Sequence, residues 1–348
     1  MKTANWLRAF FLWVLVLVLI LASLMYIVDP YFQFRVRDNS YMLNPRYVNA
    51  GLIKNYDYDT IIIGSSMTQN FDMDIFRQEL GVKPLHVSLG GITAQESAEL
   101  ISLAKSQGKA EKYYVGIDLH CFTTTKQPSN NPPYLFKDNI LSSARYLLNY
   151  EAWFRFLPVD LGFVALKAAN VSLPPKFARS CNIDMLANWE YDFTYSEKQV
   201  LENYLSSYAV SDVNTDGLAA RLADNFELVF NSVEGIEKDV VFFFPPYSML
   251  YWHSAESYRD IYLDAKAEFI ARAEAMGCTV FDFQSDELCI DLNNYRDASH
   301  YSGDINDYMT YCFANGEHKV SSADSADHRA QLMENLDLFR EKHSDILK

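Results

Sequence analysis

The sequence is poor in glycine, proline and basic residues. Its 348 residues include 13 glycines and 11 prolines and show no fixed-period repeat, which excludes collagen-like, low-complexity and solenoid architectures. Acidic residues outnumber basic ones by 45 to 30, so an electrostatic grip on the phosphates of a nucleic acid is not expected. Because 49% of the residues are hydrophobic, the chain has enough apolar side chains to fold around a core.

Cysteine is also scarce. The five cysteines form no CxxC motif and no paired Cys/His spacing, so we predict neither a metal site nor a bound cofactor. Cys278 and Cys289 flank a short predicted strand, and a disulfide between them stays open because spacing alone does not establish the geometry.

The sequence does contain one long uncharged run. Residues 9–28 are twenty residues without a charge, the length that a helix needs to cross a hydrocarbon core of about 30 Å. The alternative is a cleaved signal peptide, whose apolar core runs only about 7 to 15 residues before a small-x-small cleavage site. Because no good cleavage site precedes Tyr26, we predict an uncleaved transmembrane helix.

The flanking charges do not orient this helix, because Lys2 and Arg8 precede the run and three arginines follow it. Without Lys2 and Arg8, the remaining chain carries a net charge of −17, and a long acidic domain behind an N-terminal hydrophobic segment is normally translocated whole. We therefore expect a single-pass protein of the cell membrane, with residues 1–8 in the cytoplasm and the C-terminal domain outside it.

The remainder of the chain predicts an α/β fold. Residues 29–57 read as a juxtamembrane connector lying along the lipid headgroups, and residues 58–348 as one extracytoplasmic domain. Short apolar runs alternate with helical patterns, which indicates right-handed crossovers, a parallel sheet and functional groups at the carboxyl ends of its strands. The five predicted strands cover residues 58–64, 85–88, 113–119, 240–244 and 279–283.

Residues 120 to about 195 interrupt this alternation. A polar, proline-rich loop is followed by apolar helical stretches at residues 140–157 and 159–169. We interpret this segment as an insertion, either a lid or substrate wall or a helical subdomain that covers the sheet.

Two hydroxyl side chains, Ser65 and Ser66, follow the first predicted strand. At the end of a strand a serine can project over the sheet as a nucleophile, although a serine there can equally cap the next helix. Asp297 and His300, three residues apart, follow the fifth strand. On one helical turn the carboxylate can hold Nδ1–H while Nε2 faces outward, the arrangement that a hydroxyl nucleophile needs, although a helix cap beside a surface histidine has the same spacing.

Gly90 and Gly91 follow the second predicted strand. An acyl-transfer site needs N–H donors where the oxyanion develops, and glycine lets the backbone approach the substrate closely. A tight strand-to-helix turn explains the same two residues equally well.

Together these motifs resemble the SGNH hydrolase superfamily: a GxS block after strand one, a glycine block after strand two, a polar residue after strand three and DxxH near the C-terminus. With the predicted anchor, the segments GSSMTQNF, VSLGGIT, FFFPPYS and DASHY look most like the membrane-anchored branch that includes the AlgJ, AlgX and DltD-type proteins. The resemblance implies a flavodoxin-like three-layer fold around a five-stranded parallel sheet. Its members move acyl groups on extracellular polysaccharides or teichoic acids, usually beside a multispanning membrane-bound O-acyltransferase.

Carried over residue by residue, the resemblance makes Ser66 the nucleophile, His300 the base and Asp297 the orienting acid, with backbone N–H groups of Ser66 and Gly91 as oxyanion donors. Ser65 stands where many relatives carry Asp.

Asp118 stands after strand three, where Asn is usual. An ionised carboxylate cannot donate to an oxyanion, so Asp118 points elsewhere, is protonated or contacts an incoming sugar hydroxyl. His120 and Tyr247 are further candidates for substrate contacts, although a lone loop histidine is often simple polar surface.

These observations lead us to expect an anchored serine acyltransferase or esterase acting on acyl groups of cell-surface or exported polysaccharide, such as O-acetyl groups, through an acyl-enzyme on Ser66. Transfer and hydrolysis use the same residues, so the sequence does not separate them. Three alternatives stay open: a noncatalytic accessory that docks a membrane-bound O-acyltransferase, D-alanyl transfer or hydrolysis on teichoic acids, and a lipid-directed esterase.

Overall fold

The computed structural model describes residues 2–36, 44–124, 129–171, 194–207 and 213–347. The chain divides into two compact units. The N-terminal unit comprises Met1–Asp57 and Asn130–Leu186, and the sheet unit comprises Tyr58–Ser129 and Ala187–Lys348. The predicted insertion is therefore divided between the two units, and its residues 125–128 and 172–193 lie outside the described part of the chain.

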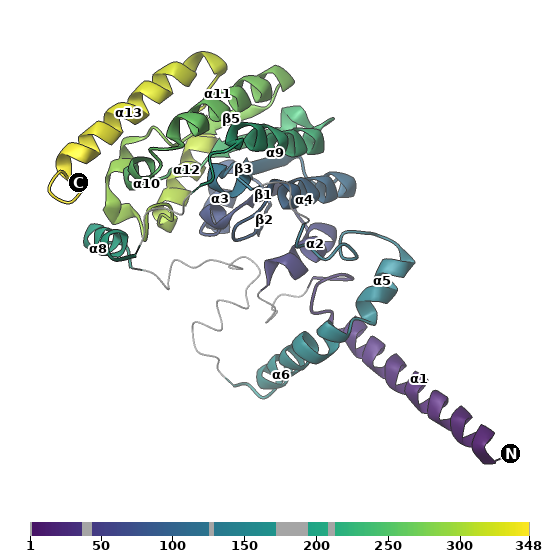
Figure 1. Ribbon diagram of the computed structural model, residues 1–348. Helices are drawn as coiled ribbons and strands as arrows, with labels where there is room; N and C mark the ends of the chain where they lie inside the picture. The colour runs from purple at the N-terminus through teal and green to yellow at the C-terminus, as the bar shows by residue number, and fades with distance from the viewer. Residues whose placement is uncertain (1, 37–43, 125–128, 172–193, 208–212, 348) are drawn as a thin grey trace. The chain divides into compact units, whose positions relative to one another are not determined.

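The sheet unit contains five parallel strands in the order β2-β1-β3-β4-β5 (Figure 1). This is the order of flavodoxin-like doubly wound sheets, and it confirms the predicted α/β class and five-stranded parallel sheet. The strands are β1 (Thr60–Gly64), β2 (Pro84–Ser88), β3 (Lys112–Gly116), β4 (Val240–Phe244) and β5 (Thr279–Asp282).

Helices cover both faces of this sheet. Successive residues of a strand point to opposite faces, and on β4 the ring of Phe242 packs against Phe230 and Phe269, whereas Phe243 packs against Phe313. Phe230 belongs to α9 (Leu218–Val233) and Phe269 to α11 (Arg259–Met276), which lie side by side, whereas Phe313 belongs to α12 (Gly303–Asn315). The unit is thus built in three layers, helix, sheet and helix.

The helices next to β1 and β2 have the ends that their sequences predict. Thr93 and Glu96 form a capping box at the start of α4 (Ala94–Gln107), where each side chain bonds the backbone N–H of the other residue. α3 (Met73–Leu80) stops at Gly81 and α4 stops at Gly108, both with positive φ. The remaining helices of this unit are α8 (Glu197–Ser207), α10 (Met249–Ser254) and α13 (Ser325–Lys342).

The N-terminal unit is helical in its described residues. It contains α1 (Lys2–Val28), α2 (Pro45–Asn55), α5 (Ile140–Leu147), a π-helix (Ala152–Phe156) and α6 (Leu157–Ala168). Within α1, the segment Asn5–Val28 is long and apolar enough to cross a membrane. The expected connector contains a helix, α2, which begins at Pro45 and which the sequence pattern did not reveal because it is short.

The buried carboxylate of Asp29 joins the end of α1 to α5. It accepts hydrogen bonds from the backbone N–H groups of Gln33, Phe34 and Arg35 at 2.8–2.9 Å, and from the hydroxyl of Tyr146 at 2.8 Å. Because Tyr146 lies in α5, more than a hundred residues along the chain, this contact joins residues of the predicted insertion to the end of α1.

Neither Cys278 nor Cys289 forms a disulfide, since both are free thiols. The interior of the sheet unit is instead tied by a buried ion pair, in which Lys266 Nζ of α11 lies 2.7 Å from Asp282 Oδ2 at the end of β5. The two side chains are 6% and 0% exposed. Burial alone would raise the pKa of Asp282, but the charge of Lys266 and a hydrogen bond from His328 outweigh it and hold that pKa below its usual range.

We expect Lys266→Met to destabilise the sheet unit by about 3–5 kcal/mol, because it leaves the Asp282 carboxylate buried without its cation. The measurement is denaturant unfolding of the full chain in detergent, with near-UV circular dichroism as the signal that reports unfolding. The matched control is Arg329→Met, which removes a surface arginine paired with Asp260 and Asp264 and should change stability by roughly 0–1 kcal/mol. Equal shifts of the unfolding midpoint in the two variants would contradict the assignment of the buried pair.

Candidate active site

A cavity of about 590 Å³ opens at the carboxyl ends of the strands in the sheet unit. Its volume lies within the range of roughly 300–1,000 Å³ typical of small-molecule sites. The loops after β1, β2, β3, β4 and β5 all contribute to it, together with α8 and α10. The lining residues are Ser66, Met67, Gly91, Asp118, His120, Cys121, Val200, Asn203, Tyr204, Tyr247, Leu250, Tyr251, Asp297, Ala298, Ser299 and His300.

The turn that follows β1 presents Ser66 to this cavity. Ser66 is the first residue of a short 3₁₀ helix, Ser66–Thr68, and Ser65 caps it by accepting the Met67 N–H at 3.1 Å. The capping role that the sequence left open therefore belongs to Ser65, and Ser66 is not used for it. Gly64 is required because a Cβ there would lie 2.4 Å from the Thr68 side chain.

Asp297 and His300 lie in a tight loop, so the expectation that they share a helical turn is wrong. The loop is closed by a β-bridge between Tyr295 and Tyr301, and the Arg296 N–H donates to the His300 carbonyl at 2.9 Å. Ser248, at the start of α10, holds the loop by donating its hydroxyl to the Ala298 carbonyl at 2.6 Å. The sequence spacing fits a turn of this kind as well as a helix, because the Asp297 carboxylate also accepts the His300 N–H at 2.9 Å.

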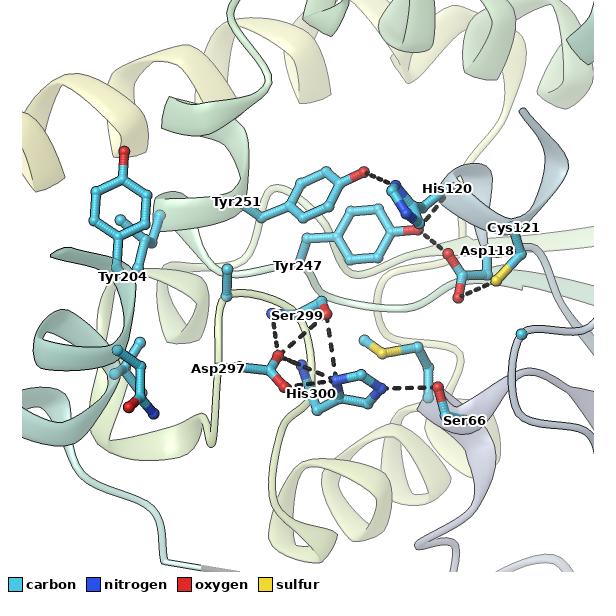
Figure 2. A pocket seen from close by; sticks show the side chains of 16 residues that line it. Ser66, Asp118, His120, Cys121, Tyr204, Tyr247, Tyr251, Asp297, Ser299 and His300 are labelled. Carbon is cyan, nitrogen blue, oxygen red and sulfur yellow. Dashed lines mark hydrogen bonds and ion pairs between the residues drawn. The ribbon is translucent and has the colours of Figure 1, made fainter. Parts of the chain in front are cut away.

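Figure 2 shows Ser66, His300 and Asp297 in a continuous hydrogen-bonded row. Ser66 Oγ lies 2.8 Å from His300 Nε2, and His300 Nδ1 lies 2.9 Å from Asp297 Oδ2. A carboxylate on Nδ1 selects the tautomer whose Nε2 can accept the serine proton. The structure therefore places the predicted nucleophile, base and orienting acid within hydrogen-bonding distance of one another, in the predicted order.

The pKa values of the pair are shifted in opposite directions. Burial would raise the pKa of Asp297, but hydrogen bonds from the imidazole and backbone of His300, and from the Ser299 N–H, hold it below its usual range. Burial would lower the pKa of His300, but the hydrogen bond and negative charge of Asp297, with a smaller contribution from the Asp118 charge, raise it. The protonated form of His300 is therefore stabilised.

Gly91 lines the cavity together with Ser66. It has a φ of +62°, and a Cβ added there would meet no atom within 4 Å, so the conformation rather than crowding favours glycine at this position. The glycine pair forms the turn between β2 and α4, which is one of the two interpretations of the sequence. The role of Gly91 as an oxyanion donor stays a prediction.

The carboxylate of Asp118 is directed at three neighbouring donors. It accepts the Ser65 hydroxyl at 2.7 Å, the Cys121 thiol at 3.2 Å and the Tyr247 hydroxyl. Burial, and then the Asp118 charge, raise the pKa values of Cys121 and Tyr247, which keeps both groups protonated as donors. Of the orientations left open by the sequence, the structure has the carboxylate pointing away from the Ser66 hydroxyl and into its own network (Figure 2).

Two stacked tyrosines form one wall of the cavity. The rings of Tyr247 and Tyr251 have centroids 4.2 Å apart, and the hydroxyl of Tyr251 lies 3.1 Å from His120 Nδ1. His120 is therefore part of this wall. The sequence did not indicate Tyr251, nor the contribution of Asn203 and Tyr204 from α8, because helix periodicity marks which residues are apolar but not which cavity they border.

A second cavity, of about 90 Å³, lies on another side of Ser66 and His300. Both residues line it together with Met67, Gln69, Asn70, Tyr195, Arg296 and Tyr301. The Ser66 hydroxyl thus stands between a large and a small space.

Within the described residues, no group of three or more His, Cys, Asp or Glu side chains is arranged to hold a metal ion. No protein-family model matches the sequence, and no curated protein matches it.

We expect the pKa of His300 to lie above the ordinary histidine value of about 6.5, and to fall in Asp297→Asn, which removes the hydrogen bond and the negative charge of Asp297 while burial still acts. An NMR titration of ¹³C-labelled histidine, with His300 assigned from His300→Gln, measures both midpoints. His253, whose pKa is lowered by burial and by Arg340, serves as the control and should not respond to Asp297→Asn. An unchanged His300 midpoint in that variant would contradict the coupling.

Proposed function

We propose that this protein is a membrane-anchored extracytoplasmic serine acyltransferase or esterase that acts on acyl groups of cell-surface or exported polysaccharide, such as O-acetyl groups, through an acyl-enzyme on Ser66. The observation that carries the proposal is the 2.8 Å contact between Ser66 Oγ and His300 Nε2, with Asp297 on the other ring nitrogen, at the wall of a large cavity. The motif resemblance to the SGNH hydrolase superfamily supports the same assignment.

The proposed reaction has two balanced halves. In the first, Ser66 Oγ attacks the carbonyl carbon of the ester, its proton passes to His300 Nε2, and the departing alcohol oxygen takes that proton as the ester bond breaks. In the second, a glycan hydroxyl or water attacks the acyl-enzyme, gives its proton to His300 and releases Ser66, which recovers the proton. Backbone N–H groups of Ser66 and Gly91 stabilise the oxyanion in both halves.

The two cavities beside Ser66 suit the two partners of an acyl transfer. The small one offers about 90 Å³, roughly the volume of three water molecules, which matches a short acyl group rather than a fatty chain. The large one, with stacked Tyr247 and Tyr251 on its wall, suits the ring of a sugar, since aromatic faces pack well against apolar ring surfaces. We assign the small cavity to the acyl group and the large cavity to the alcohol.

Support for an uncleaved anchor comes from the contacts of α1 with residues far along the chain. α1 packs against α5 and α6, its residues Met25 and Val28 are buried, and the Arg35 guanidinium donates to the Tyr26 carbonyl. A helix that forms part of a folded unit differs from a signal sequence that is removed before folding. The acidic domain is placed outside the cytoplasm on the charge argument, and a multispanning membrane-bound O-acyltransferase is the proposed source of acyl groups.

We expect a fluorophosphonate probe to label Ser66 of the full-length protein in detergent, because only an activated hydroxyl reacts quickly. Labelling should vanish in Ser66→Ala and slow by about 10²–10⁴-fold in His300→Ala, which lacks the general base. Mass-spectrometric mapping of the labelled peptide measures both effects.

The neighbouring serine provides the control for this labelling. In Ser65→Ala the label should still appear on residue 66, because the Ser65 hydroxyl bonds Asp118 and the Met67 N–H, whereas it is Ser66 that lies 2.8 Å from His300 Nε2. If a folded wild-type protein takes up no label, the catalytic assignment fails and the noncatalytic docking role takes its place.

We expect acetyl and propionyl esters of p-nitrophenol to have a kcat/KM roughly 10- to 200-fold above that of the hexanoyl ester, because the small cavity has no space for the added methylenes. Tyr195→Ala should reduce this preference by enlarging that cavity. The matched variant Tyr204→Ala removes a tyrosine from the large cavity instead and should leave the acyl-length ratio where it is. If the acyl-length ratio of kcat/KM changes in Tyr204→Ala and stays the same in Tyr195→Ala, the assignment of the two cavities is reversed.

A further inference from the structure

The helix α6 in the N-terminal unit carries an exposed apolar surface. In its first turn Leu157 and Asp160 are buried, each 2% exposed, whereas Val159 is 44% exposed. Beyond that turn Leu161, Val164 and Leu166 are 37–46% exposed. Apolar side chains on so many sides of one helix are typical of a helix immersed in an apolar medium, because a helix on the surface of a soluble domain pairs its apolar stripe with a polar face.

The surface continues towards the start of α6. We define the α6 apolar surface as Tyr150, Phe154, Val159, Leu161, Val164 and Leu166, all exposed. Contiguous apolar surface of this kind marks an interaction site rather than ordinary protein surface.

This surface adjoins α1. α1 packs against α5, the π-helix and α6, and α6 begins beside the C-terminal end of α1 (Figure 1). Since α1 is the helix long and apolar enough to cross a membrane, the unit that carries the α6 apolar surface also carries the proposed anchor. The end of a membrane-spanning helix lies at the boundary of the lipid, so a neighbouring helix that begins there is at the depth of the bilayer interface.

The length of α6 decides how it can lie in lipid. Its 12 α-helical residues extend about 18 Å, well short of the hydrocarbon thickness of about 30 Å, and the π-helix Ala152–Phe156 runs directly into them. The charged residues Arg155 and Asp160 make a span by the combined helical segment unfavourable, and a short apolar helix is typical of an interfacial or re-entrant segment. The sequence of residues 161–171 contains one charged residue, Lys167.

Aromatic and basic side chains stand at the start of the helix. Trp153, Phe154 and Phe156 belong to the π-helix that leads into α6, and Arg155 between them is 68% exposed at its side chain. Tryptophan and other aromatic rings favour the headgroup region, where their apolar bodies and polar edges are both satisfied, and an arginine there can contact lipid phosphates. This arrangement places the π-helix at the headgroups and α6 deeper in the lipid.

We propose that the α6 apolar surface is embedded in the same lipid leaflet as the C-terminal end of α1, so that the anchor is a two-helix membrane module rather than a single span. The occupant of this surface is lipid acyl chain. The proposal rests on the membrane anchor of the proposed function and is independent of the acyl chemistry at Ser66.

The test uses full-length protein reconstituted in phosphatidylcholine vesicles, with one residue replaced by the genetically encoded fluorescent amino acid acridonylalanine. Bromine atoms on the acyl chains quench a fluorophore only at close range. With the fluorophore in place of Val164, brominated lipid should lower the fluorescence about twofold or more relative to unbrominated lipid, as expected for a side chain among acyl chains. Leu161 provides a second position on the same surface, in case the first variant does not fold.

Two matched positions make the outcomes distinguishable. Leu17 of α1 is 57% exposed and should be quenched if α1 spans the bilayer, and Leu338 of α13, 50% exposed on the sheet unit, should not be quenched. Quenching at 17 and at 164 supports the proposal. If only the fluorophore at position 17 is quenched, and those at positions 161 and 164 keep the same fluorescence in brominated lipid as the one at position 338, the proposal is overturned. The α6 apolar surface then binds a protein partner instead. Absence of quenching at 17 overturns the anchor itself.

Discussion

The buried carboxylate of Asp118 is the constraint on which the candidate site depends. Its three donors come from the loops that follow three different strands: Ser65 after β1, Cys121 after β3 and Tyr247 after β4. A buried carboxylate is costly unless hydrogen bonds compensate it, so the three hydrogen bonds to Asp118 hold these loops together. Ser65 then accepts the Met67 N–H and fixes the turn that carries Ser66. An asparagine has one acceptor oxygen and two amide hydrogens, so it cannot accept all three donors in this way.

The same carboxylate also contributes to the electrostatics of the base. Asp297 accounts for most of the rise in the pKa of His300, and the negative charge of Asp118 adds to it. His300 therefore lies in a field that favours its protonated form, the form that the proposed attack by Ser66 would produce. In that proposal a carboxylate at position 118 supplies no oxyanion donor, and it contributes instead to the stabilisation of the imidazolium and to the hydrogen bonds that fix the turn carrying Ser66.

The sequence predicted those parts of the structure that follow from local pattern and strand topology. Continuous apolar runs located all five strands, and the parallel order brought Ser66 and His300 to one edge although they are 234 positions apart. The conformation of the Asp297–His300 loop was predicted wrongly because the same spacing suits a helix and a turn. The partners of Asp118 were not predictable, since Tyr247 lies 129 positions away and a tyrosine at the end of an apolar strand has many possible neighbours. The sequence did not predict helix α2, because its eleven residues are too few to show a clear helical periodicity.

The division of the chain changes what the insertion between β3 and β4 does. The N-terminal unit takes up both the residues before Tyr58 and the inserted residues that begin at Asn130. The Asp29 carboxylate, which bonds both the segment after α1 and Tyr146 of α5, makes the end of the membrane helix and the inserted residues parts of one folded unit. Because α5 and α6 pack against α1, the insertion builds the unit that carries the long apolar helix, rather than only covering the sheet.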